Sequence, residues 1–188
     1  MRAPYGGHMN EASDSIARRQ REMVSAHVMS WRAIPAVLVD RHLDVIASNS
    51  LARALTPSFH LGVNLARFAF LDPKIERSGA PFHAAAQQIV GMLNDSLTRH
   101  SGDTEFREIV GELSAKSQAF SEAWAESIGV HVTGTARFTD TTHGAIDLGY
   151  SLVSIPDDPE DTLIVFCATT GSAQSTLDVI ITAREADA

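Results

Sequence analysis

The stretch "VHVTGTARF" (residues 130–138) decides the fold class, because the hydrophobic pattern changes its period there. Apolar residues and Gly134 occupy every second position from Val130 to Phe138, which is typical of a half-buried β-strand. Two further strand-like stretches follow, "AIDLGYSLVSI" (145–155) and the nearly all-apolar "TLIVFCA" (162–168). The sequence therefore predicts three antiparallel strands, with turns at "DTTHG" (140–144) and at "PDDPED" (156–161), the second of them exposed.

Upstream of this stretch, the pattern predicts a hairpin and then a helical block. The stretch "AVLVDRHLDVIAS" (36–48) has two β-branched runs around a polar turn at Asp40 to His42. Apolar residues then recur at helical spacing up to Gly129. The helices expected there run from a cap at Asn49 or Ser50 to Leu55, from Asn64 to Asp72-Pro73, and over 81–100, 103–113 and 117–127. A last helix is expected over 175–183.

This order of elements predicts an α+β domain with a PAS-like five-stranded antiparallel sheet and the helical block packed on one face. Other α+β sheets share the order, so the pattern alone leaves them open. We expect residues 34–188 to form this domain and residues 11–33 to form a linker helix that ends before Pro35. Residues 1–10, which include "GGHM", are typical of a cloning remnant or a disordered end.

The composition restricts the class of protein. With 188 residues, 44% of them hydrophobic, the chain can bury a core and fits one domain. Its net charge of -8 disfavours direct binding to nucleic acid. No apolar run reaches the roughly 18 residues of a membrane helix and no secretion signal is evident, so we expect a cytoplasmic protein. The single cysteine, Cys167, lies in an apolar run and is expected to be buried.

Signals for metal or cofactor chemistry are weak. The eight histidines are scattered, and no cysteine cluster, phosphate loop or nucleophile elbow occurs. The acidic residues from Asp157 to Asp161 are expected to form a surface turn rather than a calcium site. We therefore predict no cofactor, no metal site and no catalytic residue.

Four blocks of sequence carry a resemblance to a known family. They are "PAVLVDRHLDVIASN" (35–49), "NLARFAFLDP" (64–73), "VGELSAKSQAFSEAW" (110–124) and "GAIDLGYSLVSIPDDPEDTLIVFCATTGS" (144–172). In this order and spacing, the chain from Ile34 to Ala183 resembles the MmyB-like ligand-binding domain, the carboxy-terminal sensory half of a group of bacterial helix-turn-helix transcription regulators. The resemblance implies a PAS-like fold.

The chain also departs from that family pattern. Ser48 stands before Asn49 where the family has Trp, Phe82 replaces another Trp, and a His-Asp-Val element is missing at 127–129. Only one predicted helix precedes the domain, which is too little for a DNA-reading unit. DNA is therefore expected to be contacted only through a helix-turn-helix domain that is not present in this chain.

The resemblance implies binding of a small, largely apolar, fatty-acid-like molecule between the helical block and the sheet. Arg67 is either a hook for a carboxylate or a surface arginine whose stem packs on Phe68 or Phe70. For the apolar candidates, ordinary core packing is the alternative. The expected ligand-binding residues are Asn64, Arg67, Phe68, Phe70, Met92, Leu93, Phe120, Trp124, Phe138, Tyr150 and Phe166.

Two other functions remain open from the residues: a structural interaction module with a filled core, and a small α+β enzyme that uses the same cleft. The enzyme would use Tyr150 or His131 as acid or base, although strand alternation puts His131 opposite to Phe138. The leading interpretation is a sensor whose linker helix relays ligand binding to a DNA-binding domain. We also expect a homodimer, in which the Val24, Val28 and Met29 side of this helix pairs with a second subunit.

Overall fold

The computed structural model describes residues 7–127, 129–139, 141–155 and 158–186, with five antiparallel strands in one sheet. The strand order across the sheet is β2-β1-β5-β4-β3, so β5 lies between the hairpin and the last part of the chain. The strands are β1 (Ala36–Val39), β2 (Val45–Ser48), β3 (Thr133–Phe138), β4 (Ile146–Ile155) and β5 (Asp158–Ala168). The predicted five-stranded, PAS-like antiparallel sheet is confirmed.

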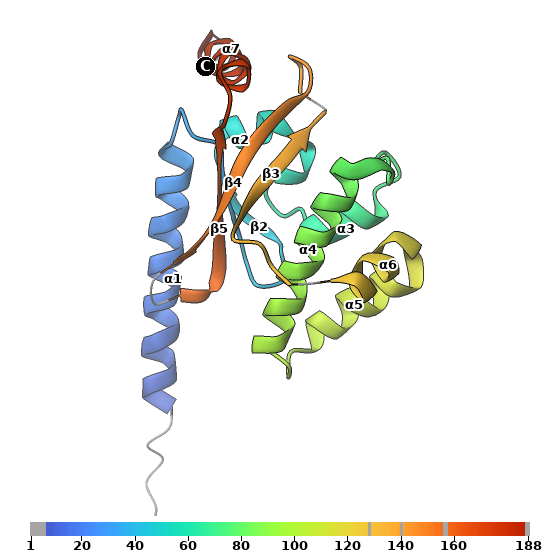
Figure 1. Cartoon of the computed structure of the whole chain (residues 1–188). Helices are drawn as coiled ribbons and strands as arrows, with labels where there is room; N and C mark the ends of the chain where they lie inside the picture. Colours follow the sequence, from blue (N-terminus) through green and yellow to red (C-terminus); the bar gives the residue numbers. More distant parts are fainter. Residues whose placement is uncertain (1–6, 128, 140, 156–157, 187–188) are drawn as a thin grey trace, which may run out of the picture.

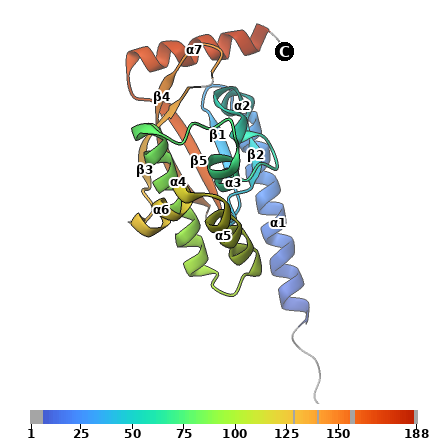
Figure 2. The same cartoon turned by 90° about the vertical axis from the view of Figure 1, so that its right-hand side faces the viewer.

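The helical block covers one face of this sheet (Figure 2). It consists of α2 (Ser50–Leu55), the 3-10 helix η1 (Pro57–Phe59), α3 (Leu65–Leu71), α4 (Gly79–Arg99), α5 (Thr104–Lys116) and α6 (Gln118–Glu126). Their apolar faces meet the sheet in one large core, which includes fully buried Phe106, Phe120 and Leu148. The predicted packing of a helical block on one face is therefore confirmed.

Side-chain caps explain where several of these helices begin. Asn49 Oδ1 accepts the N–H of Ala52 at 2.9 Å, and Asn64 Oδ1 accepts the N–H of Arg67 at 3.0 Å. Asp103 caps α5 in the same way, through the N–H of Glu105 at 2.9 Å. The starts predicted at Asn49 and Asn64 are confirmed.

Helix α7 (Gly171–Ala186) crosses one end of the sheet (Figure 1). It begins earlier than the predicted Ser175, because Thr170 Oγ1 accepts the N–H of Ala173 at 3.2 Å and so caps the helix upstream. Leu177 and Ile180 bury its inner face in the large core.

Helix α1 (Gly7–Ser30) lies on the face of the sheet opposite to the helical block (Figure 1). It begins before the predicted Glu11, and residues 1–6 lie outside the described part. Val28 is fully buried against Leu38, Ala47 and Leu163, and Val24 packs beside it. Of the residues expected to face a second subunit, Val24 and Val28 thus face the sheet of their own chain, while Met29 is 60% exposed.

The turn between β1 and β2 is built around Asp40. Its Oδ1 accepts the N–H groups of His42 and Asp44, each at 2.9 Å. This turn holds Leu43 at a φ of 69°, a conformation that leucine rarely adopts, while its side chain is buried. The predicted hairpin is confirmed.

Two predictions of exposure are wrong. Asp161 was expected in an exposed turn, but β5 begins at Asp158, and pairing with β1 and β4 draws Asp161 into the sheet, where it is buried. Cys167 was expected to be buried but is exposed. Strand alternation directs it away from buried Phe166, and it lies beyond the cluster that α1 forms with Leu163 and Val165.

Candidate ligand site

Aromatic side chains wall the interface between the sheet and the helical block. Phe59, Phe138 and Phe166 form a triangle with ring centroids 5.3 to 5.8 Å apart. Phe120 lies 5.2 Å from Phe70 and 5.4 Å from Trp124, which joins α3 to α6. The two groups belong to one continuous core.

Most of the apolar residues expected at the site are gathered in this core and are buried. They are Phe70, Met92, Leu93, Phe120, Phe138 and Phe166. Trp124 and Tyr150 are partly buried at its edge, and Phe68 is partly buried on α3. Because these side chains pack on one another, an apolar ligand would have to part them in order to enter.

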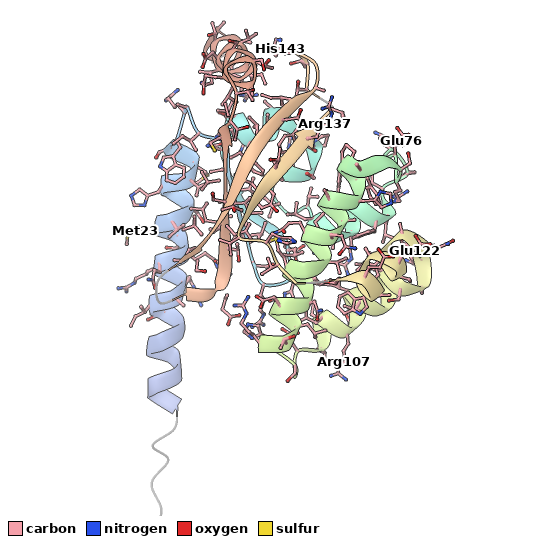
Figure 3. The ribbon with its side chains drawn as sticks, in the orientation of Figure 1. Met23, Glu76, Arg107, Glu122, Arg137 and His143 are labelled. Carbon is pink, nitrogen blue, oxygen red and sulfur yellow. The ribbon has the colours of Figure 1, made fainter. Side chains whose placement is uncertain are left out.

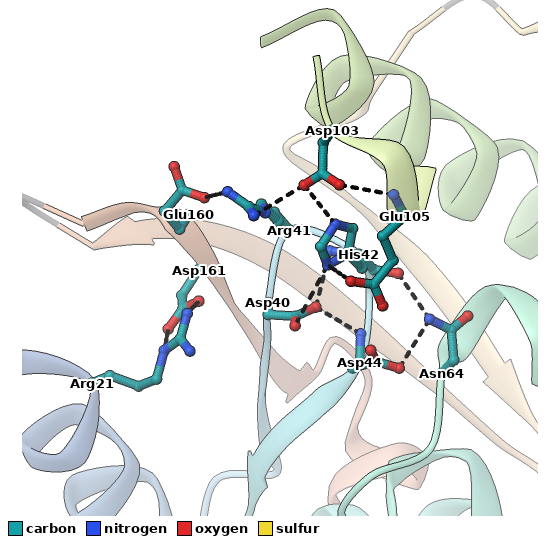
Figure 4. Close-up of polar contacts among 10 residues, drawn as sticks. All are labelled: Arg21, Asp40, Arg41, His42, Asp44, Asn64, Asp103, Glu105, Glu160 and Asp161. Carbon is teal, nitrogen blue, oxygen red and sulfur yellow. Dashed lines mark hydrogen bonds and ion pairs between the residues drawn. The ribbon is translucent and has the colours of Figure 1, made fainter. Parts of the chain in front are cut away.

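Asn64 holds local structure with its whole amide group. Its Oδ1 caps α3, and its Nδ2 donates to His42 O at 2.8 Å and to Asp44 Oδ1 at 3.0 Å. The side chain is buried, so these bonds fix α3 against the β1–β2 hairpin (Figure 4). In this arrangement Asn64 positions the helix that carries Arg67.

Arg67 connects α3 to α5. Its side chain is 40% exposed, and Nε donates to Glu112 Oε2 at 2.8 Å. Lys116 Nζ donates to the other oxygen of Glu112 at 2.9 Å. The hydrogen bonds from Lys116 and Arg67 lower the pKa of Glu112, although burial acts in the opposite direction. An anion that bound Arg67 through Nε would compete with this carboxylate.

Tyr150 lies partly buried on β4, opposite Gly134 of β3. Gly134 allows this contact, because a Cβ at that position would lie 2.6 Å from Tyr150 Oη. Burial raises the pKa of Tyr150, which keeps the hydroxyl neutral and able to donate a hydrogen bond. His131, the other residue considered as an acid or base, is exposed, and Gln88 bonds to its backbone from α4.

A polar cluster surrounds the buried side chain of His42, and sequence reasoning missed it. His42 Nε2 lies 3.0 Å from Asp103 Oδ2, and Nδ1 lies 3.6 Å from Glu105 Oε2 and 4.0 Å from Asp40 Oδ2 (Figure 4). The imidazole also packs on Phe106 with centroids 4.6 Å apart. No local sequence signal pointed to the cluster, because it joins a hairpin turn to the start of α5.

The carboxylates of this cluster differ in acidity. Burial raises the pKa of Asp40, and the negative charge of Asp44 raises it further. Burial also acts to raise the pKa of Asp103, but hydrogen bonds from the Glu105 N–H and from His42 outweigh it, so this pKa is lowered. Asp103 therefore stays ionised beside His42 and Arg41.

Two arginines extend the polar contacts to β5. Arg41 Nη1 donates to Glu160 Oε2 at 2.7 Å, and its Nη2 lies 2.9 Å from Asp103 Oδ2. On α1, Arg21 forms a forked pair with Asp161, through Nε at 2.6 Å and Nη2 at 2.5 Å. Within the described residues, no group of three or more His, Cys, Asp or Glu side chains could hold a metal ion.

Comparison with known proteins relates the chain to one described family of domains. The model of a family described as "MmyB-like transcription regulator ligand binding domain" matches residues 21–177. The match begins in α1 and ends in α7, so it spans the sheet, the aromatic core and the polar cluster. No curated protein matches the chain. None of the helices that the structure describes is long and apolar enough to cross a membrane.

Proposed function

Because the chain belongs to the family of MmyB-like transcription regulator ligand-binding domains, we propose that it senses a small, largely apolar molecule and relays its binding to a helix-turn-helix DNA-binding domain. Ligand sensing for transcription regulation is the role of the family. The apolar ligand is our inference from the aromatic core between the helical block and the sheet, where Phe70, Phe120 and Trp124 meet. Such walls suit an acyl chain, because ligand sites are mostly apolar with few polar groups.

Ligand binding must favour a more open arrangement of the helical block. The core side chains are packed in the structure, so the space for a ligand arises only when α3 and α6 move away from the sheet. A ligand shifts the balance between the two arrangements only by the difference in its affinity for them. Partly buried Trp124 and Tyr150 lie at the edge where such a movement would begin.

We place the anionic end of a fatty-acid-like ligand at Arg67. Its guanidinium would exchange Glu112 for the ligand carboxylate, which frees α3 from α5. This exchange links binding to movement, because the ion pair that it breaks joins two helices of the block. The proposal includes that the protein acts in the cytoplasm and catalyses no reaction.

Arg67 and Glu112 give the test of this proposal. Arg67→Ala should weaken binding of a saturated long-chain fatty acid, used as the probe, by more than about 1.5 kcal/mol, roughly tenfold. Glu112→Gln should strengthen it, because the competing charge is gone. Arg107→Ala is the control, since Arg107 is an exposed arginine on α5 that points outward (Figure 3). Isothermal titration calorimetry measures the affinity of the wild type and of the three variants for the fatty acid.

Two results would contradict the proposal at different levels. Unchanged affinity in both Arg67→Ala and Glu112→Gln would leave Arg67 as a packing residue. Failure of the wild-type chain to bind the fatty acid, together with native mass spectrometry that shows no co-purified apolar molecule, would contradict the apolar ligand itself.

The same proposal includes a homodimer formed through α1. Ile16, Met23 and Met29 are 63%, 59% and 60% exposed, whereas Val24 and Val28 are already used against the sheet. Met23 points away from the sheet (Figure 3). A second copy packed on this outer face would bring two α1 helices together, next to the DNA-binding domains that we expect beyond them.

A further inference from the structure

Ion pairs run from α1, through β5, to the start of α5 (Figure 4). They cross the sheet at two neighbouring residues, Glu160 and Asp161. Successive residues of a strand point to opposite faces, so Asp161 reaches Arg21 of α1 while Glu160 reaches Arg41 at the β1–β2 turn. Charged groups on the two faces of the sheet are thus joined through one peptide unit of β5.

The two partners of the ion pair between Arg21 and Asp161 have unequal surroundings. The side chain of Asp161 is fully buried, whereas that of Arg21 is 42% exposed. A buried carboxylate needs the charge of its partner more than an exposed arginine does, so the pair holds α1 to the sheet at this point. A small displacement of β5 at Glu160 would move Asp161 as well and change this hold.

Arg41 shares its guanidinium between two elements. One nitrogen pairs with Glu160 of β5 at 2.7 Å, and the other pairs with Asp103, the cap of α5, at 2.9 Å. The β1–β2 turn is held beside this part of β5, because Val39 pairs with Thr162. Arg41 therefore has two alternatives: it bridges both carboxylates, or it pairs with Glu160 alone when α5 moves.

Asp103 links the position of α5 to the charge at Arg41. One of its oxygens caps the helix at the N–H of Glu105, and the other meets both Arg41 and His42. Hydrogen bonds weaken steeply as their distance and angle depart from the optimum, so movement of α5 would break this contact before it unfolded the helix.

We propose that Asp103, Arg41, Glu160, Asp161 and Arg21 form a relay through the sheet, by which the position of α5 sets how firmly α1 is held. The inference rests on the proposed function, which requires a path from the helical block to the amino-terminal helix. The relay supplies that path by polar contacts rather than by the apolar core, and it operates in the ligand-free chain.

Hydrogen exchange of the full chain without ligand tests the relay. Asp103→Asn removes the charge but keeps a side chain that caps helices well, so α5 remains formed. We expect amide exchange of α1 around Arg21 to become at least about fivefold faster, although α1 lies on the other face of the sheet. Arg137→Ala is the matched control, because it removes an ion pair with Asp147, 2.9 Å long, that lies on β3 and β4 away from the path.

A second pair of variants makes the result decisive. Arg21→Met releases α1 directly and sets the largest expected change, while Arg41→Met cuts the middle of the path. If Arg21→Met accelerates exchange in α1 but Asp103→Asn and Arg41→Met leave it as in the wild type, the relay is wrong. If Asp103→Asn accelerates exchange throughout β4 as well, it has destabilised the whole domain, and Arg41→Met alone decides. Fatty-acid binding is measured separately, so failure of the relay leaves the proposed ligand intact.

Discussion

At the scale of the residue, the carboxyl group of Asp40 stabilises a turn by its hydrogen bonds, whereas burial of its negative charge is unfavourable. The turn uses Asp40 Oδ1 as the acceptor for two backbone N–H groups. Burial raises the pKa of the same carboxyl above its ordinary value of 3.8. Ionised Asp40 is thus less favourable in the folded chain than in the unfolded one, while the turn needs only its acceptor oxygen.

Asp40→Asn should therefore change the pH dependence of stability. A carboxyl whose pKa is raised by folding binds more protons in the native state, so its contribution is full below 3.8 and is lost as pH rises through the folded pKa. Asparagine keeps the acceptor oxygen and does not titrate. The free energy of unfolding of the variant, minus that of the wild type, should increase as pH rises from about 4 to 7. Urea unfolding at several pH values measures it, and a difference that stays constant would show that Asp40 titrates normally.

At the scale of the element, two glycines in successive helices differ in the space around them: a side chain would clash at Gly91 but not at Gly111. Gly91 of α4 faces the loop after α6. A Cβ atom added at Gly91 would clash with the carbonyl group of Gly129, because it would lie 2.8 Å from the carbonyl carbon. Gly129 itself has a φ of 107°, a backbone conformation that favours glycine. Gly111 of α5 is exposed and has no atom within 4 Å of the Cβ position.

The same substitution should therefore have opposite effects in the two helices. Gly91→Ala should lower the free energy of unfolding by about 2 kcal/mol through overpacking. Gly111→Ala should raise it by about 0.5 to 1 kcal/mol, because alanine favours a helix interior. Thermal and urea unfolding followed by circular dichroism compare the variants. Stabilisation by both would mean that α4 does not approach this loop closely.

Local signals predicted the elements well, and long-range pairing explains what they missed. Asn49 and Asn64 could be recognised as helix caps because their partners lie three residues away. The early start of β5, by contrast, depends on strands far along the chain, so Asp161 could not be predicted as buried.

The apolar part of the candidate site was predictable from the sequence, whereas its polar contacts were not. Apolar periodicity predicted that residues such as Phe70, Phe120 and Phe166 would share one core, because it marks the face that each element buries. The partners of its charged groups were not predictable. Glu112 lies 45 residues from Arg67, and Asp103 lies 61 residues from His42. Only the fold brings such pairs together.

At the scale of the whole molecule, α1 makes the sheet a middle layer between two helical layers (Figure 1). Its inner face is anchored by Val28 and by the pair of Arg21 with Asp161. Its outer face carries exposed Ile16 and Met23. One helix can therefore respond to the domain on one side and contact a second subunit on the other.

Light scattering during size-exclusion chromatography checks the homodimer. At micromolar concentration we expect a mass of about twice the 20.2 kDa of the chain. Met23→Lys should reduce it toward the monomer, because a charge would be placed in an apolar contact. Val179→Lys is the control, since Val179 is a similarly exposed apolar residue on α7. A monomeric wild type would remove the support for the dimer.

The exposure of Cys167 has a practical consequence. It is the only cysteine of the chain, and it is exposed on the central strand of the sheet. A maleimide fluorophore or a nitroxide spin label would therefore attach at one known position without any prior mutagenesis. In a symmetric pair of chains, dipolar spectroscopy between the two nitroxides would then report the separation of the two sheets directly in solution.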